Sequence, residues 1–407
     1  MAAISSEDTT QAVRSEFLVF GAPDLQQTEV DEVVATLESG WIGMGPRCIR
    51  FEELFRQYIG CAHAVSLNSC TAGLELALDA LGIGPGDEVI TTPLTFCATA
   101  NVVVHRGAKP VFADVDPVTG NIDPEQVRQA LSPRTKAILP VHLYGRPCEM
   151  DPLLELAREH GLAIVDDAAH ATEARYRGRK IGAIGDMSVF SFYVTKNMTT
   201  AEGGMLTTAN AAWADAVRIK RLHGLSHDAW KRYSSEGFQP YDVLAAGYKF
   251  NMTDLQAALG IHQLARLEAN LAVRENYWRI YDEGFSEMPE VQIPPQVPEE
   301  LLESGSRHAR HLYTLLVNSP TSPLTRWELV QALKAENIGT GVHFVALNLT
   351  TYYQQAFGYR RGDFPHAEYI SDRTVSLPLS PALKEEDLRD VIRAVKKVLR
   401  PKLVAVP

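Results

Sequence analysis

The sequence predicts an α/β protein: a large domain built on a mostly parallel, doubly wound sheet, followed by a smaller α+β domain. Two observations predict this class. Short apolar runs alternate with helical stretches as far as Gly185, which is the pattern of a parallel sheet with right-handed crossovers. The runs are also continuously apolar rather than alternating in polarity, as expected for strands that are covered on both faces.

Two helices are predicted before the first strand. Residues 28–40 carry valine and leucine at helical spacing, and Gly40 can end this helix. A second helix follows, with an apolar face formed by Phe51, Leu54, Phe55 and Tyr58. Strands are then predicted at Ala64–Leu67, Glu88–Thr91, Pro110–Asp114, Lys136–Val141 and Leu162–Val165. Helices between them are predicted at Thr71–Leu81, Ala98–His105, Pro124–Ala130 and Asp151–His160.

Past Gly185 the pattern changes. Strands are predicted close together at Met187–Phe192 and Gly204–Thr207, and one long helix runs from Thr253 to about Tyr281. The remaining predicted elements are strands at His311–Val317 and Gly341–Phe344 and helices at Arg326–Glu336 and Glu385–Leu399. We therefore divide the chain into a flexible tail at residues 1–14, a large domain at 15–260 and a smaller domain at 261–407.

Composition excludes several classes of protein. The 407 residues are 45% hydrophobic, which suffices for a sizeable core, and the formal net charge of −11 gives no overall basic footprint for nucleic acid. No apolar run approaches the ~20 residues of a membrane helix. The polar, acidic start does not resemble a signal or transit peptide. Five cysteines without a C-x-x-C pair favour a reducing compartment, so we expect a cytoplasmic protein with no metal site.

The first candidate site is the segment Asn68–Gly73, between a predicted strand and helix. Its small and hydroxylated residues leave backbone N–H groups free at a helix N-terminus, which suits an anion such as phosphate. An ordinary N-cap by Ser69 or Thr71 explains the same residues. Both readings stay open at this point.

The second candidate is the pair Asp166 and Asp167, directly after a buried strand. Two buried carboxylates are costly unless each has a partner. In the functional interpretation, one of them faces a cationic group in a site. In the alternative, one caps the next helix and the other faces water.

The third candidate is Lys196, which lies between two predicted strands in a stretch of aromatic and small polar residues. Most lysines lie on solvated helix faces. A lysine held between strands is expected to be partly desolvated and to have a lowered pKa. Such an amine can act as a nucleophile or bond a carbonyl carbon.

A phosphate cradle, a carboxylate for a protonated ring nitrogen and a reactive lysine are together what pyridoxal 5′-phosphate (PLP) requires. Their order along one α/β domain resembles that of the fold-type I PLP enzymes. More narrowly, the motifs DDAAHA at Asp166–Ala171 and SFYVTKN at Ser191–Asn197 are similar to those of the DegT/DnrJ/EryC1/StrS family of sugar aminotransferases. The likeness covers nearly the whole chain, and within the family it is greatest to the aminotransferases that make UDP-4-amino-4-deoxy-L-arabinose.

This resemblance implies a role for individual residues. Lys196 matches the lysine that bonds the cofactor, and Asp167 matches the partner of the pyridine nitrogen. The other positions implied are His170 near the ring hydroxyl, Phe96 on the ring face, Cys70, Thr71 and Ser191 at the phosphate, Lys249 and Asn251 at the phosphate of a neighbouring subunit, and Trp41 and His343 at the substrate. The resemblance thus implies a homodimer with shared active sites.

The implied reaction is transfer of an amino group from glutamate to a nucleotide-linked keto sugar, at C4. One alternative is a PLP-dependent sugar dehydratase or deoxygenase, but relatives of that type carry histidine where this chain has Lys196. Another is a non-catalytic sensor of PLP or of a sugar nucleotide. The stretch from Arg307 to His311 fits no zinc spacing, and we interpret it as the partly exposed start of a strand.

Overall fold

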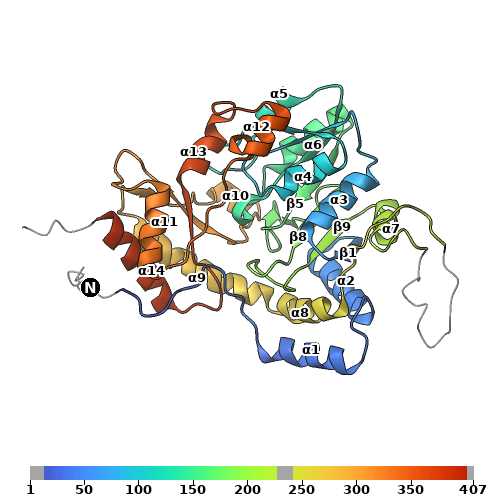
Figure 1. The fold of residues 1–407 in the computed structure, drawn as a ribbon, viewed down its shortest axis with the longest axis horizontal. Coiled ribbons are helices and arrows are strands. Elements are labelled where there is room, and N and C mark those ends of the chain that lie inside the picture. The colour runs from blue at the N-terminus through green and yellow to red at the C-terminus, as the bar shows by residue number, and fades with distance from the viewer. Residues whose placement is uncertain (1–12, 227–241, 401–407) are drawn as a thin grey trace, which may run out of the picture.

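The computed structural model describes residues 13–226 and 242–400, and it shows a central sheet between two layers of helices and a second, smaller sheet (Figure 1). The predicted tail, residues 1–14, lies outside the described residues except for its last two positions. No helix in the described part of the chain is both long and apolar enough to cross a membrane. The cytoplasmic location stays a prediction.

The central sheet has seven strands in the order β1-β9-β8-β5-β4-β2-β3. Only β9 runs against the others: it pairs antiparallel with β1 and β8, while the remaining neighbours pair in parallel. The strands are β1 (His63–Leu67), β2 (Glu88–Thr91), β3 (Lys109–Phe112), β4 (Thr135–Leu139), β5 (Ala163–Asp167), β8 (Met187–Ser191) and β9 (Gly204–Thr208). The predicted mostly parallel sheet is confirmed, with strand ends that differ from the predicted ones by at most two residues.

Helices cover both faces of this sheet. One face packs against α3 (Cys70–Ala80), α4 (Ala98–His105) and α7 (Ala211–Lys220). The other packs against α2 (Pro46–Ile59), α5 (Pro124–Ala130), α6 (Met150–His160) and α8 (Asp254–Ala265). Because side chains alternate along a strand, Ile164 of β5 belongs to the second core and Val165 to the first. Helix α1 (Gln27–Glu38) lies along α8, outside these layers (Figure 1).

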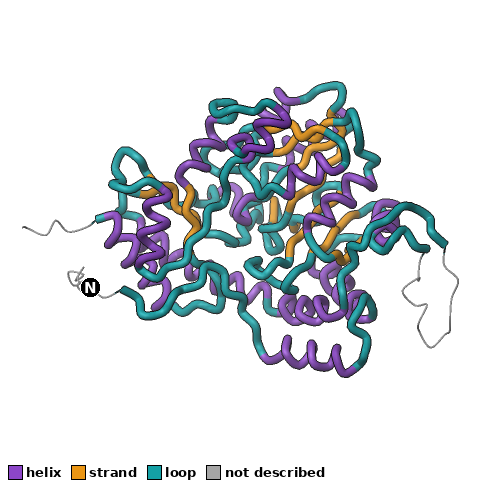
Figure 2. Tube along the Cα trace, in the orientation of Figure 1, coloured by secondary structure: helices purple, strands orange, loops and turns teal. Residues whose placement is uncertain are grey.

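The smaller sheet is antiparallel, in the order β10-β11-β12, and Figure 2 shows it apart from the central sheet and flanked by helices. Its strands are β10 (Val291–Gln292), β11 (Tyr313–Val317) and β12 (Thr374–Leu377). Its core comes chiefly from α9 (Leu267–Phe285), α11 (Arg326–Ala335) and α14 (Glu385–Leu399). Shorter elements complete the chain: the hairpin β6 (Arg175–Tyr176) and β7 (Arg179–Lys180), and helices α10 (Glu299–Glu303), α12 (Thr351–Phe357) and α13 (Pro365–Arg373).

Two predicted elements are wrong. The strand expected at Gly341–Phe344 does not form, and only Gly341 makes an isolated bridge, to Ser376. The carbonyl of His343 instead accepts hydrogen bonds from the side chains of Tyr144 and Thr374, and β12 occupies the place beside β11.

The helix expected from Thr253 to Tyr281 is two helices. It breaks at Arg266, whose backbone angles of −109° and 8° are not helical and whose guanidinium pairs with Glu29 and donates to the Asp24 carbonyl. Residue 260 lies inside α8. The division into domains at 15–260 and 261–407 stays a prediction.

Candidate active site

Asp167 ends β5 on the face that is covered by α3 and α4. Its side chain is buried, with 6% exposed, and it accepts hydrogen bonds from Thr99 Oγ1 at 2.8 Å and from the Ala169 backbone N–H at 3.1 Å. Thr99 in turn lies 2.8 Å from Thr95 Oγ1. Burial raises the pKa of the Asp167 carboxyl, while these two donors and the Lys196 ammonium oppose the rise.

Asp166 points to the opposite face of the sheet, because neighbouring residues of a strand alternate. It is fully buried, accepts a hydrogen bond from Ser188 Oγ at 2.6 Å, and lies 3.8 Å from His142 Nε2. Burial raises the pKa of Asp166 to about 7. The alternative in which one aspartate caps a helix and the other faces water is therefore wrong.

Lys196 follows β8 in a turn that its own backbone N–H closes by donating to the Tyr193 carbonyl at 2.8 Å. Its side chain retains some exposure. The surrounding protein lowers the pKa of the Lys196 amine to about 8, and the charges of Asp167 and Cys70 act in the other direction. The lowered pKa of Lys196 agrees with the expectation for a lysine held between two strands.

Five predicted site residues share one electrostatic environment around Lys196. Asp167 and Cys70 raise the pKa of Lys196, as noted, and the Lys196 charge contributes to the lowered pKa values of His170 and His343. Burial is the larger cause for both histidines, and the pKa of His343 falls to about 4. The two predicted centres of the chemistry, Asp167 and Lys196, therefore lie close enough for the charge of each to change the pKa of the other.

Aromatic rings extend this site. The ring of Phe344 stacks on His170, with centroids 6.0 Å apart, and lies 6.2 Å from Phe96. Phe96 is 59% exposed, so one part of its ring is free to meet a bound molecule. His343 stacks on Phe20 at 5.5 Å, and its Nδ1 lies 2.7 Å from Ser376 Oγ.

The predicted anion cradle lies at the N-terminus of α3. Ser69 is the N-cap and accepts from the Ala72 backbone N–H at 3.1 Å, which leaves the N–H groups of Cys70 and Thr71 without an acceptor inside the helix. Both sequence interpretations of this segment are thus compatible. Gly204 packs against this turn: a Cβ there would lie 2.5 Å from the Ser69 carbonyl carbon.

Ser191 is brought to the same place by the sheet. It pairs with Gly204 across β8 and β9, and it is buried, with 7% exposed. Cys70, Thr71 and Ser191 therefore gather at one end of α3, and their contact with a phosphate stays a prediction.

Trp41, Lys249 and Asn251 lie elsewhere. They line an open hollow, whose lining includes Asn68 but not Lys196. The Asn68 side chain donates to the Lys249 carbonyl at 3.2 Å, and Asn251 forms a bridge to the end of β1. Within this chain, these three residues are not gathered around Lys196.

Sequence reasoning missed several residues that support this site. Thr99 near the start of α4 carries a signal in retrospect, because it follows Thr95 by four residues and the two hydroxyl oxygens lie 2.8 Å apart. Tyr144, whose backbone N–H donates to His170 Nδ1 at 3.2 Å, carries none. The prediction that residues 307–311 form the partly exposed start of a strand is wrong for the two histidines. His308 and His311 are buried, with 6% and 4% exposed. In residues 13–226 and 242–400, no group of three or more acidic, histidine or cysteine side chains is arranged for a metal ion.

Comparison with known proteins also indicates an aminotransferase. Residues 23–396 match the model of the DegT/DnrJ/EryC1/StrS aminotransferase family. The spore coat polysaccharide biosynthesis protein SpsC of Bacillus subtilis is 50% identical over 388 residues, which cover 95% of this chain and 98% of SpsC.

Solved structures are also similar. Spr1654 of Streptococcus pneumoniae, solved in its PLP form, is 33% identical with a TM-score of 0.85, covering 94% of this chain and 98% of that one. DesI, solved in the presence of its TDP-sugar product, is 31% identical with a TM-score of 0.83, covering 95% and 94%.

Proposed function

We propose a specific reaction for this chain, which belongs to the DegT/DnrJ/EryC1/StrS aminotransferase family and is a PLP-dependent sugar aminotransferase of fold type I. The reaction is transfer of the amino group of glutamate to a nucleotide-linked keto sugar, at C4. The observation that carries the proposal is a partly exposed lysine of lowered pKa whose charge interacts with that of a buried aspartate, which itself has two hydrogen-bond donors.

The residues present fit the cofactor. The N–H groups of Cys70 and Thr71 at the start of α3, with Ser191 beside them, suit its phosphate. Asp167 can hold the proton of the pyridine nitrogen, because its two hydrogen bonds favour the ionised carboxylate. PLP, when bound, supplies a protonated ring that withdraws electrons from the carbon bearing the amino group.

The chain's own residues do the proton transfer. Lys196 would hold the cofactor at rest. Once its amine is free, Nζ would take the proton from Cα of glutamate and deliver it to the cofactor carbon that bears the nitrogen, and it would move a proton in the opposite direction for the sugar. With a pKa of about 8, a fraction of this amine is neutral near neutral pH. Phe96 would cover the ring face and His170 would face the ring hydroxyl. Trp41 and His343 bind the sugar nucleotide.

The proposed homodimer explains why Trp41, Lys249 and Asn251 are gathered apart from Lys196. In a two-fold dimer, such residues can complete the site of the neighbouring subunit. Refolding a mixture of Lys196→Ala chains and Lys249→Ala/Asn251→Ala chains tests this. Hybrid dimers would contain one intact site, so a statistical mixture should recover about a quarter of wild-type activity. Recovery of none contradicts the shared site.

The substrate is tested with purified PLP-loaded protein, glutamate and a panel of UDP- and dTDP-4-keto sugars, with the amino sugar followed by mass. We expect one nucleotide-linked 4-keto sugar to be aminated. If glutamate converts the cofactor to its amino form but no keto sugar reverses the conversion, the sugar assignment is wrong.

The same assay separates the alternatives. A dehydratase or deoxygenase would release water from the sugar without gaining nitrogen, and the presence of Lys196 speaks against it. A sensor would bind ligands with no turnover.

A further inference from the structure

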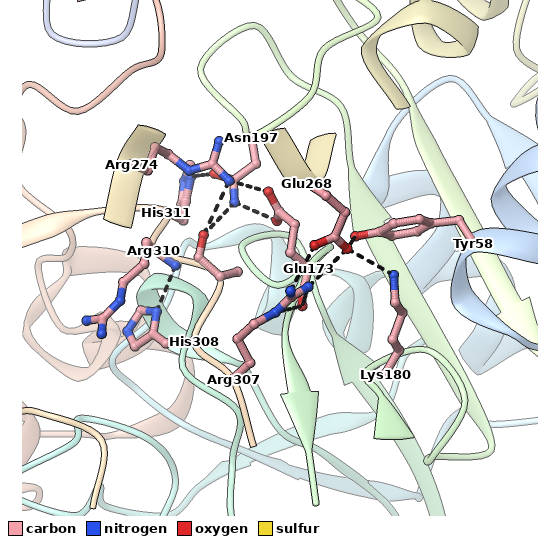
Figure 3. Close-up of polar contacts among 11 residues, drawn as sticks. Tyr58, Glu173, Lys180, Asn197, Glu268, Arg274, Arg307, His308, Arg310 and His311 are labelled. Atoms are coloured by element: carbon pink, nitrogen blue, oxygen red, sulfur yellow. Dashed lines mark hydrogen bonds and ion pairs between the residues drawn. The ribbon is translucent and has the colours of Figure 1, made fainter. Parts of the chain in front are cut away.

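A connected series of polar side chains leads from Arg274 of α9 through Glu173 and Asn197 to His311 (Figure 3). Glu173 and Arg274 form an ion pair with no more than 1% of either side chain exposed. The Asn197 side chain donates from Nδ2 to Glu173 Oε2 at 2.7 Å and to the Ala309 carbonyl at 3.0 Å. Asn197 directly follows the lysine proposed to bond the cofactor.

These contacts fix the orientation of the Asn197 amide. Its two N–H bonds meet a carboxylate and a carbonyl, both of which only accept, so the reversed orientation would set Oδ1 against two acceptors. Oδ1 must therefore face His311 Nδ1, which lies 2.8 Å away. Since Oδ1 only accepts, the hydrogen of neutral His311 is on Nδ1, and Nε2 carries a lone pair.

His170 has the opposite tautomer. Its Nδ1 accepts from the Tyr144 backbone N–H, so the hydrogen of neutral His170 is on Nε2. The rings of His170 and His311 are in contact, with centroids 4.4 Å apart and planes inclined by 36°. Both histidines stay neutral, because burial and neighbouring cations lower the pKa of each. The groups acting on His311 are Lys196, His343, Arg274 and His308.

We propose that His311 is a positioning residue: Glu173 and Asn197 fix its tautomer and ring plane, and its ring packs against His170 and holds the plane of that ring, so that the Nε2–H that Tyr144 imposes on His170 is directed toward the cofactor. Arg274 keeps the Glu173 carboxylate ionised and in place. The proposal rests on the role of His170 in the proposed function, and it adds residues that need not touch the cofactor.

The first test uses the cofactor-free protein and nitrogen-15 NMR of its histidine rings, assigned with single histidine variants. We expect the wild type to show His311 with hydrogen on Nδ1 and His170 with hydrogen on Nε2. Asn197→Ala should leave His311 as a mixture of tautomers. An unchanged His311 tautomer in Asn197→Ala, or hydrogen on Nε2 of His311 in the wild type, would overturn the proposal.

The second test is the dissociation constant for PLP and the pH midpoint of the visible band of the bound cofactor. Asn197→Ala removes the neutral hydrogen bond between Asn197 and His311. This loss should weaken PLP binding on the order of three- to tenfold and shift the pH midpoint of the visible band. Asn276→Ala, which removes a partly exposed asparagine of α9 that contacts Glu385, is the matched control and should change neither value. Equal PLP affinity and midpoint in wild type and Asn197→Ala would refute the link to His170.

A second variant guards against a folding defect. His311→Phe keeps a ring against His170 but removes the hydrogen bond to Asn197, and it leaves Glu173 with its partners. His311→Phe should show the same shifted midpoint as Asn197→Ala. His311→Gln can still donate to Asn197, so its midpoint should lie between the shifted value and that of the wild type. Normal midpoints in both would sink the proposal. A wild type that binds PLP and aminates no keto sugar would instead refute only the sugar assignment.

Discussion

Replacing Thr99 by valine removes one of the two hydrogen bonds to the Asp167 carboxylate while keeping the shape of the side chain. Thr99 is fully buried, and its single hydroxyl hydrogen must go to the carboxylate, which only accepts. Thr95 therefore donates to Thr99, and the two hydroxyls form a short directed chain.

The size of the effect follows from this contact. A hydrogen bond to a charged group contributes about 1.5–3 kcal/mol, and one pKa unit corresponds to about 1.4 kcal/mol. The pKa of Asp167 should therefore rise by about one to two units in Thr99→Val, in addition to the rise that burial already causes. A protonated Asp167 cannot pair with a protonated pyridine nitrogen, so PLP binding should weaken about ten- to a hundredfold.

Equilibrium dialysis with PLP at pH 7 and pH 9 measures this. The sign is set by the raised acid pKa: the defect should become smaller from pH 7 to pH 9, because a higher pH favours the ionised form of Asp167. Thr99→Ser keeps the hydroxyl and is the matched control, with near-normal affinity expected. If Thr99→Val, folded as judged by its melting curve, binds PLP as tightly as wild type at pH 7, the hydrogen bond does not hold Asp167 ionised.

Three further outcomes are expected. Lys196→Ala should bind PLP without the visible band of the lysine-bonded cofactor, and persistence of that band in absorption spectra would point to a different lysine. Gly204→Ala should weaken phosphate-dependent PLP binding, because its Cβ would lie 2.5 Å from the Ser69 carbonyl carbon; unchanged dialysis constants for PLP would contradict this. Asp166→Asn should remove a pH-dependent loss of stability. The pKa of Asp166 is about 7 in the folded protein and 3.8 in the unfolded chain. Protonated Asp166 therefore stabilises the fold fully below pH 3.8 and progressively less as the pH rises to 7. Urea unfolding should therefore favour the variant at pH 8 relative to pH 5, and equal differences at both pH values would argue against the raised pKa.

Sequence patterns were sufficient for the sheet and for the residues that end its strands. Continuous apolar runs identify strands such as Glu88–Thr91, whose predicted and observed bounds agree, because burial on both faces leaves no alternation to confuse the reading. The terminal helix Glu385–Leu399 is also found as predicted, since its apolar residues recur at helical spacing.

Long-range contacts could not be predicted in this way. The break at Arg266 depends on a pairing with Glu29, which is more than two hundred residues away, and no local signal marks it. The strand predicted at Gly341–Phe344 failed for the same reason, because the His343 carbonyl binds side chains from distant segments. The burial of His311 likewise depends on Asn197 and His170 meeting it from other parts of the chain.

Asp166 and Asp167 show how far environment decides the chemistry of identical neighbours. Asp167 is the next residue after Asp166 along β5, so its side chain points to the opposite face of the sheet. There it meets Thr99, the Ala169 backbone N–H and the charge of Lys196, all of which favour its ionised form. Asp166 faces the other core, where only Ser188 and a backbone N–H favour the ionised form while nearby carboxylates oppose it. The first environment suits a carboxylate that must stay charged against a cationic ring, and the second suits a neutral group in the core. Exchanging their surroundings by shifting the register of β5 by one residue would therefore abolish cofactor binding without changing the composition of the strand.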